Sequence, residues 1–350
     1  MAGASRAHAM RKRKFAARGG AELQFTELGF GAAPLGNMYR PLTEKEARAT
    51  LDTAWNIGCR YYDTAPLYGL GLSETRLNGF LRAKPRDSYL ISTKVGRLLE
   101  LSTPEQRTRR DQFFEVPART ERFDYSYDGV MRSLEFSLER LGLDHIDIVY
   151  AHDVDTFTHG SKEAADQRIK ELMSGGYKAL LKLRDSGAIK AFGAGVNEWE
   201  IAEQLARAGD FDVFLLAGRY TLLEQEALES FLPYCVEKKI GVVIGGPFNS
   251  GILATGPRPG AYYNYKPAPK TILDRVANIQ AICVKHKVKL AEAALRFAVS
   301  HPAIVSVIPG GQKPSEVRRN GEMLSVKIPA ALWRDLKAAG LMRADAPTPR

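Results

Sequence analysis

Eight short β-rich runs alternate along this chain with stretches whose apolar residues recur every three or four positions. Such alternation is typical of parallel βαβ units, and 350 residues leave room for eight of them. The runs expected to form strands are 28–32, 60–63, 89–94, 146–151, 190–196, 213–217, 241–245 and 304–308. Eight strands with eight crossovers predict an α/β fold, a (β/α)8 TIM barrel, with a doubly wound sheet as the alternative.

The stretches between the runs carry helical patterns. In the first of them, Ala47, Leu51 and Ala54 lie on one helical face. Thr43 stands three residues before Glu46, which is the spacing of a capping box. A helix is therefore expected to begin just after Thr43.

The two ends of the chain and two long connections stand apart from this alternation. Residues 1–22 hold much of the net charge of +10 among Ala and Gly, and we expect a disordered basic arm there. A single domain is expected over 23–342, with a short antiparallel addition at 23–27 and a flexible tail at 343–350. The long connections, 97–124 and 246–270, are expected to cover the C-terminal face of the barrel.

Composition excludes several classes of function. Cys59, Cys235 and Cys283 are widely spaced, so neither a disulfide framework nor a metal site is expected, and a reducing cytoplasm is the expected setting. No run of about 18 apolar residues is present, so no membrane partner is expected. No aromatic platform accompanies the basic residues, so no nucleic-acid partner is expected either. The oligomeric state expected is a monomer or a small homo-oligomer.

Four reactive side chains follow strands of the expected barrel. Asp63, Lys94 and His152 stand at strand ends, and Tyr68 follows Asp63 on a turn. In a (β/α)8 barrel these positions share the C-terminal rim, where chemistry is found. Taken singly, each residue also has a purely structural interpretation. Asp63 could cap a helix or a turn and Tyr68 could be a half-buried aromatic. Lys94 could form an ion pair at the rim, and His152 could be a strand-end histidine with its hydrogen bonds satisfied. Together they predict an acid/base site in which Lys94 lowers the pKa of Tyr68, Asp63 holds Lys94, and His152 orients a substrate oxygen.

These residues resemble the catalytic tetrad of the aldo-keto reductase family, and the resemblance extends over nearly all of residues 28–341. The family's Asp, Tyr, Lys and His match Asp63, Tyr68, Lys94 and His152 one by one. The resemblance implies hydride transfer to or from a nicotinamide dinucleotide that lies across the barrel mouth without a Rossmann domain. Accordingly, no GxGxxG follows the first run, and the partial matches at 29–31 and 193–195 are interpreted as strand glycines.

The resemblance also implies the cofactor contacts. The family's usual Ser-Asn pair at the carboxamide is Asn197-Glu198 here, and the aromatic residue that often stacks on the nicotinamide aligns with Gly245. The residues expected to bind cofactor are Gly36, Asn37, Asn197, Gly246, Pro247, Asn249, Ser250, Gly251, Pro309, Gly310, Gly311, Gln312, Glu316, Arg319 and Asn320.

The identity of the cofactor depends on residues 310–320, a loop that opens the last helix. Glu316 stands where NADP-specific relatives hold the 2′-phosphate, and its carboxylate would repel that group while accepting bonds from ribose hydroxyls. NAD is therefore favoured. NADP is the alternative, with Lys313, Arg318 and Arg319 as the cations that would hold its phosphate.

Residues 215–223 and 243–251 resemble the aldose 1-dehydrogenase branch of the family, which includes enzymes for L-fucose, D-threo-aldoses, L-galactose and pyridoxal. Arg219 is the expected substrate-binding residue, with a rim ion pair as its structural interpretation. The activity expected is oxidation of the anomeric hydroxyl of an aldose to a lactone. Pyridoxal oxidation, NADPH-dependent carbonyl reduction and a non-catalytic regulatory subunit are the alternatives.

Overall fold

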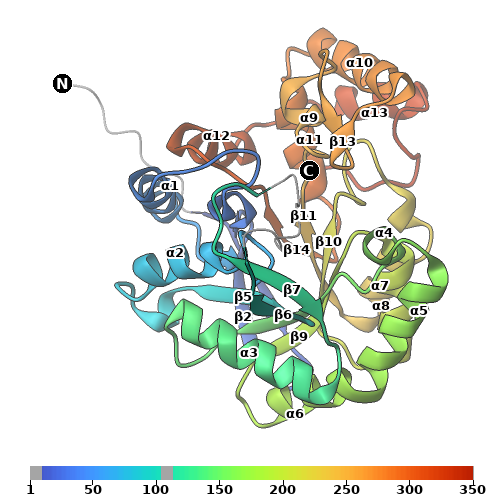
Figure 1. The fold of residues 1–350 in the computed structure, drawn as a ribbon. Coiled ribbons are helices and arrows are strands. Elements are labelled where there is room, and N and C mark those ends of the chain that lie inside the picture. The colour runs from blue at the N-terminus through green and yellow to red at the C-terminus, as the bar shows by residue number, and fades with distance from the viewer. Residues whose placement is uncertain (1–9, 104–112, 350) are drawn as a thin grey trace.

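Eight parallel strands form the centre of the molecule in a computed structural model that describes residues 10–103 and 113–349. Figure 1 shows them enclosed by helices. Parallel bridges from Leu28 to Val307 and from Gly31 to Gly310 join the first strand to the last, so the sheet closes into the predicted barrel. Each predicted run overlaps one strand. In order around the barrel these strands are β3 Phe30–Gly31, β4 Tyr61–Asp63, β5 Leu90–Val95, β8 Ile148–His152, β9 Ala191–Val196, β10 Val213–Ala217, β11 Gly241–Gly245 and β14 Ile304–Ile308.

The helices pack around the outside of the strands. The capping box predicted at Thr43 and Glu46 is present and starts the first helix. Among the described residues the α-helices are α1 Glu44–Asn56, α2 Leu72–Leu81, α3 Tyr127–Leu141, α4 Thr156–His159, α5 Lys162–Glu171, α6 Tyr177–Asp185, α7 Trp199–Ala208, α8 Phe231–Lys238, α9 Ile252–Thr255, α10 Lys270–Lys285, α11 Leu290–Ala298, α12 Pro314–Leu324 and α13 Ala330–Ala338.

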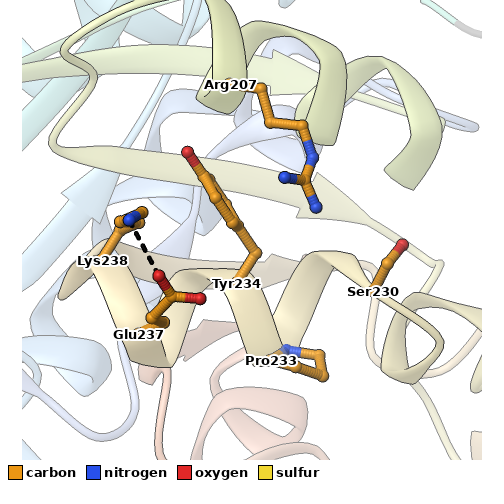
Figure 2. A pocket seen from close by; sticks show the side chains of 6 residues that line it. All are labelled: Arg207, Ser230, Pro233, Tyr234, Glu237 and Lys238. Carbon is orange, nitrogen blue, oxygen red and sulfur yellow. Dashed lines mark ion pairs between the residues drawn. The ribbon is translucent and has the colours of Figure 1, made fainter.

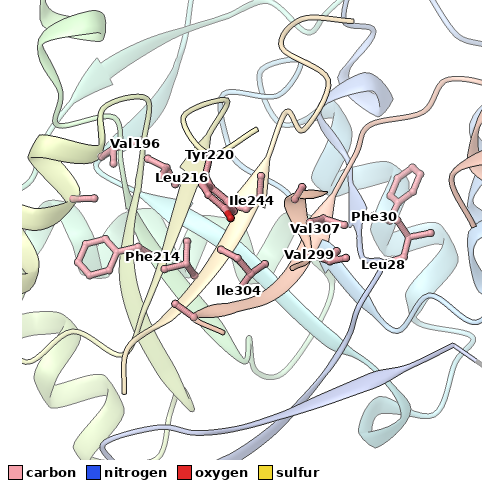
Figure 3. Close-up of a cluster of buried hydrophobic side chains, with 14 of the residues drawn as sticks. Leu28, Phe30, Val196, Phe214, Leu216, Tyr220, Ile244, Val299, Ile304 and Val307 are labelled. Atoms are coloured by element: carbon pink, nitrogen blue, oxygen red, sulfur yellow. The ribbon is translucent and has the colours of Figure 1, made fainter. Parts of the chain in front are cut away.

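Strand alternation divides the apolar residues into two cores. Along β10, Phe214 and Leu216 belong to the larger core between strands and helices, which Figure 3 shows together with Ile244 of β11. Leu215 belongs to the smaller core inside the barrel, with Val243 of β11. Because successive side chains of a strand point to opposite faces, both cores come from the same strands.

A hairpin closes the bottom of the barrel. Strands β1 (Lys12–Ala16) and β2 (Glu22–Thr26) pair antiparallel, and Phe25 is fully buried in the barrel core. Arg13 donates to the carbonyl oxygen of Ile304 at 2.6 Å and pairs with Glu27 at 2.7 Å. The prediction of a disordered arm is therefore wrong for residues 10–22, because these apolar and charged contacts hold them; residues 1–9 lie outside the described residues.

The carboxyl end of the chain packs against the helical layer. Ser300 Oγ donates to the carbonyl oxygen of Pro347 at 2.9 Å, and the amide of Arg343 donates to Gln225 Oε1 at 2.8 Å. Ala346 is buried. The flexible tail predicted from residue 343 is wrong up to residue 347, since these contacts fix it.

Both long connections contain hairpins. Strands β6 (Arg97–Leu101) and β7 (Arg119–Phe123) pair in the first connection, and β12 (Tyr262–Tyr263) and β13 (Lys266–Pro267) pair in the second. Residues 104–112 of the first connection lie outside the described residues. In the described part of the chain, no helix is long and apolar enough to cross a membrane.

Candidate active site

A buried ion pair lies at the rim of the barrel, at the ends of two neighbouring strands. Lys94 Nζ of β5 donates to Asp63 Oδ2 of β4 at 2.7 Å and to the carbonyl oxygen of Thr64 at 2.8 Å. Ser92 Oγ donates to the other Asp63 oxygen at 2.7 Å. Burial raises the pKa of Asp63, and the charge of Lys94 opposes that shift. The predicted pairing of Asp63 with Lys94 is present.

Tyr68 lies above this pair on the turn that follows β4. Lys94 Nζ is 4.6 Å from the centroid of the Tyr68 ring, so the ammonium faces the ring. The ring of His152 stands nearly perpendicular to that of Tyr68, with the two centroids 6.0 Å apart. The fold thus brings the four predicted catalytic side chains together at one rim.

The prediction that Lys94 lowers the pKa of Tyr68 is wrong for this structure. The pKa of Tyr68 is raised well above its usual value, first by burial and then by the carboxylates of Asp63 and Asp153. The ammonium of Lys94 is neutralised by Asp63 at 2.7 Å, so little of its field reaches the phenol. In this structure Tyr68 therefore holds its proton at neutral pH.

His152 ends β8 and is held by its neighbours. Its Nε2 lies 3.2 Å from Asp153 Oδ2, an oxygen that can accept a hydrogen bond from that nitrogen when it carries the proton. Its backbone carbonyl oxygen accepts a bond from Tyr125 Oη at 2.6 Å. The His152 ring can thus present an N–H group at the barrel mouth.

Arg97 is a site residue that the sequence reasoning missed. It is the largest fully buried side chain among the described residues, and it begins β6 just after Lys94. Its guanidinium pairs with Glu121 Oε2 and with Asp153 Oδ2, each at 2.5 Å. An Arg three residues beyond a rim lysine was the available signal, but its partners come from distant parts of the chain.

Several predicted cofactor residues lie in two loops that follow neighbouring strands. β11 pairs with β14, with Gly245 opposite Ile308, so the loops after them share one part of the rim. In the loop after β11 the backbone is left-handed at Gly246, Asn249, Ser250 and Gly251. The loop after β14 contains Pro309, Gly310, Gly311 and Gln312, and α12 then carries Arg319 on its exposed surface and Asn320 in a buried position.

Two predicted cofactor residues have side chains that bond within the protein. Asn37 Oδ1 accepts from Arg76 at 2.7 Å and from the Leu42 amide at 3.0 Å, and its Nδ2 donates to Phe114. Asn249 Oδ1 accepts from Thr221 Oγ1, and Asn249 Nδ2 donates to the carbonyl oxygen of Gly218. These two amides fix loops, so contacts to a ligand from these positions would come from the backbone.

Glu316 completes a capping box at the start of α12. Its Oε2 accepts from the Gln312 amide at 2.8 Å and from the Lys313 amide at 3.3 Å. The carboxylate therefore lies at the helix start, where the helix would otherwise favour a phosphate group. This contact was not predicted, and it adds to the repulsion expected between Glu316 and a 2′-phosphate.

Arg219 connects the barrel mouth to the second hairpin. Its Nε donates to the carbonyl oxygen of Asn197 at 2.8 Å, and its Nη1 donates to Asn264 Oδ1 at 2.7 Å. Asn264 and Tyr265 form the left-handed turn of the hairpin, and the Tyr265 amide donates to Ser250 Oγ at 3.0 Å. The pKa of Tyr265 is raised first by burial and then by Tyr68, so this hairpin lies near the tetrad.

Asn197 lies at the end of β9, beside the tetrad. Its Nδ2 donates to Asp153 Oδ1 at 3.1 Å and to Asp155 Oδ2 at 3.2 Å. Its neighbour Glu198 instead accepts the first amides of α4, from Thr156 at 2.9 Å. Asn197 is therefore placed at the mouth and Glu198 is occupied by a helix start.

A separate surface hollow of about 550 Å³ is unrelated to the tetrad. Its lining residues come from α7, from α8 and from the turn before α8, as Figure 2 shows. Arg207 lies over the ring of Tyr234 there, 4.2 Å from its centroid, and also pairs with Glu203. These side chains pack and form ion pairs with one another on the outer helical layer, so we do not assign this hollow as the catalytic centre.

The rim residues fit a nicotinamide dinucleotide. The loop after β11 offers left-handed backbone at Gly246 and at residues 249–251, and a Cβ on Gly251 would meet nothing within 4 Å. Lys313, Arg318 and Arg319 supply positive charge at one end of this strip. The tetrad and the side-chain amide of Asn197 lie at the other end of this strip.

Comparison with known proteins agrees with this geometry. Residues 27–340 match the sequence profile of the Aldo/keto reductase family. The chain is 42% identical over 334 residues to a D-threo-aldose 1-dehydrogenase of Pseudomonas sp, a match that covers 94% of this chain and 97% of the other. It is 40% identical over 329 residues to a pyridoxal 4-dehydrogenase of Microbacterium luteolum, which covers 91% and 95%. An aldo-keto reductase structure from Bacillus halodurans has the same fold, with a TM-score of 0.71 at 23% identity over 96% of this chain and 98% of that one.

Proposed function

This chain belongs to the aldo-keto reductase family, and we propose that it is an NAD(P)-dependent aldose 1-dehydrogenase that oxidises the anomeric hydroxyl of an L-fucose-like or D-threo-aldose sugar to the lactone. The resemblance predicted from the tetrad motif is confirmed by the family match. The observation that carries the proposal is the buried Asp63–Lys94 pair beneath Tyr68, at a rim shared with His152. The choice of an aldose is supported by the relative that shares 42% of its residues.

Each tetrad side chain has its own role in this proposal. In oxidation Tyr68 accepts the proton of the anomeric hydroxyl, and in reduction it returns that proton. Lys94, fixed by Asp63, packs its ammonium group against the Tyr68 ring and holds the ring in place. His152 donates its Nε2–H to the reacting oxygen and so holds that oxygen near the phenol.

The cofactor would lie along the strip of loops after β11 and β14. Bound in its oxidised form, it would supply the hydride acceptor and a positive charge beside the phenol. Residues 246–251 and 309–312 would hold it through their backbone, Asn197 would hold the carboxamide, and Arg319 and Asn320 would contact the adenosine end. We favour NAD because Glu316 caps the helix start that a 2′-phosphate would need; NADP would require Lys313 or Arg318 to outweigh that carboxylate.

Two other activities have observations in their favour. Pyridoxal oxidation is supported by the relative at 40% identity. NADPH-dependent carbonyl reduction is supported by the raised pKa of Tyr68, because a protonated phenol is ready to donate. Both would use the same four side chains, so substrate turnover decides between them.

The deciding experiment is a panel of aldoses and pyridoxal, each assayed with NAD and with NADP by the absorbance of the reduced nicotinamide. We expect the largest kcat/KM with L-fucose or a D-threo-aldose and NAD, at least about tenfold above pyridoxal, a difference of 1.4 kcal/mol. Turnover of pyridoxal alone, or only carbonyl reduction with NADPH, would replace the proposed activity by the corresponding alternative.

A further inference from the structure

Asp153 stands at the barrel mouth in a backbone conformation that is uncommon for a residue with a Cβ. It follows His152 directly, and its φ of 52° lies in the left-handed region. Its amide donates to the carbonyl oxygen of Gly195 at 2.8 Å, which ties it to β9. Such residues persist where the surrounding structure holds them, and they gather at functional sites.

The Asp153 carboxylate is held from two sides and open on another. Oδ2 accepts from Arg97 at 2.5 Å and faces His152 Nε2 at 3.2 Å, while Oδ1 accepts from Asn197 at 3.1 Å. The Asp153 side chain is 13% exposed, whereas that of Arg97 is 1% exposed. Asp153 is thus the most exposed carboxylate of this cluster.

Three carboxylates lie close together around Asp153 in the described part of the chain. Arg97 is shared by two carboxylates, Glu121 and Asp153, and Asp155 adds a third behind Asn197. Burial raises the pKa of Asp153 to about 6 while Arg97 opposes the shift, so this carboxylate is ionised at neutral pH. Lys94 is already balanced by Asp63. An ionised carboxylate only accepts hydrogen bonds, so a ligand group that contacts the exposed part of Asp153 must be a hydrogen-bond donor.

We propose that Asp153 accepts a hydrogen bond from the substrate hydroxyl next to the reacting carbon, and that this contact selects aldoses over simple alcohols and aldehydes. The inference rests on the proposed function, in which His152 Nε2 binds the reacting oxygen. When Nε2–H turns to that oxygen, the neighbouring hydroxyl takes its place at Asp153 Oδ2. Asn197 and Arg97 keep the carboxylate in position.

The test compares a substrate with its analogue that lacks this hydroxyl, in wild type and in Asp153→Asn. For L-fucose against 2-deoxy-L-fucose we expect a wild-type kcat/KM ratio of about 10- to 100-fold, the range of a charge-assisted hydrogen bond. Asp153→Asn should bring that ratio to about threefold or less, mainly through the KM of L-fucose. Equal loss with both sugars would show that Asp153 acts on the reacting centre and would overturn the inference.

Asp147→Asn is the matched control. Asp147 is fully buried and pairs with Arg86 and Lys190, each at 2.7 Å, but it lies just before the start of β8, at the end opposite to Asp153. This variant should lose stability and keep the wild-type substrate ratio. A changed ratio in Asp147→Asn would mean that the ratio reports general damage, and the inference would then fail.

A second measurement needs no variant and covers the case in which Asp153→Asn does not fold. The wild-type ratio should fall as the pH drops below about 6, because Asp153 takes up a proton there. A ratio that stays constant between pH 8 and pH 5 would contradict the inference. Wild-type turnover of pyridoxal without any aldose would instead refute the proposed function, and the same comparison would then use pyridoxal and 3-deoxypyridoxal.

Discussion

Gly36 packs so closely against the turn bearing Tyr68 that a Cβ on residue 36 would lie 2.4 Å from the Tyr68 carbonyl carbon. Backbone atoms cannot move aside as a flexible side chain does, so Gly36→Ala should displace Tyr68. A displacement of about 1 Å can cost about 10²-fold in rate, and we expect kcat to fall by 10- to 100-fold. Gly79→Ala is the control, since nothing lies within 4 Å of its Cβ position in α2; it should leave kcat unchanged and raise the melting temperature slightly.

Asp63→Asn and Lys94→Met should move the pKa of Tyr68 in opposite directions. Asp63 raises that pKa and neutralises Lys94, so Asp63→Asn should lower it, whereas Lys94→Met leaves the Asp63 carboxylate without its partner and should raise it. In oxidation the activity rises with pH as Tyr68 loses its proton. The pH dependence of kcat/KM should therefore shift to lower pH in Asp63→Asn and to higher pH in Lys94→Met. Shifts in the same direction in both variants would exclude this electrostatic coupling.

Arg97→Met should be strongly destabilising. It would leave the carboxylates of Glu121 and Asp153 without their buried partner, which typically costs about 3–5 kcal/mol in the free energy of unfolding. Arg122→Met, in the same hairpin, is the control because Arg122 and Glu100 are about half exposed, and such pairs contribute about 0–1 kcal/mol. Urea unfolding of both variants measures the difference, and similar losses would show that the buried cluster contributes no more than a surface pair.

The double variant Glu316→Arg with Gly310→Lys should change cofactor preference. It removes the carboxylate that caps α12 and adds two cations where a 2′-phosphate would lie. We expect kcat/KM for NADP relative to NAD to rise about tenfold or more, equivalent to 1.4 kcal/mol. Glu322→Arg, an equal charge change near the other end of α12, should leave the preference unaltered. A wild-type enzyme that already prefers NADP would show that Glu316 does not repel the phosphate.

The fold and the tetrad could be predicted because both follow from local patterns. Each strand is a short apolar run, and the carboxyl ends of parallel strands must share one rim, so Asp63, Lys94 and His152 had to meet. The capping box of Thr43 and Glu46 could be predicted for the same reason, since these two residues are three positions apart in the sequence. None of these features needs knowledge of a distant contact.

The remaining features depend on contacts between distant segments. The Arg97–Asp153 pair joins residues 56 positions apart, and the neutralisation of Lys94 by Asp63 outweighs a through-space effect on Tyr68 that the sequence alone had suggested. The antiparallel addition predicted at 23–27 is confirmed by β2, but its partner β1 was missed because the basic residues of β1 concealed its alternation. Gly19-Gly20, between that run and the alternating Leu23 and Phe25, was the turn signal that could have revealed it.

The central claim, that Tyr68 is the acid/base of an aldose dehydrogenase, is tested most directly by Tyr68→Phe. The substitution removes one hydroxyl from a half-buried ring, so the fold and dinucleotide binding should be retained, as measured by melting temperature and by quenching of protein fluorescence on adding NAD. The rate of L-fucose oxidation should fall by about 10²–10⁴-fold, the usual contribution of a general acid/base group. A variant that binds NAD and keeps more than about a tenth of the wild-type rate would contradict the account.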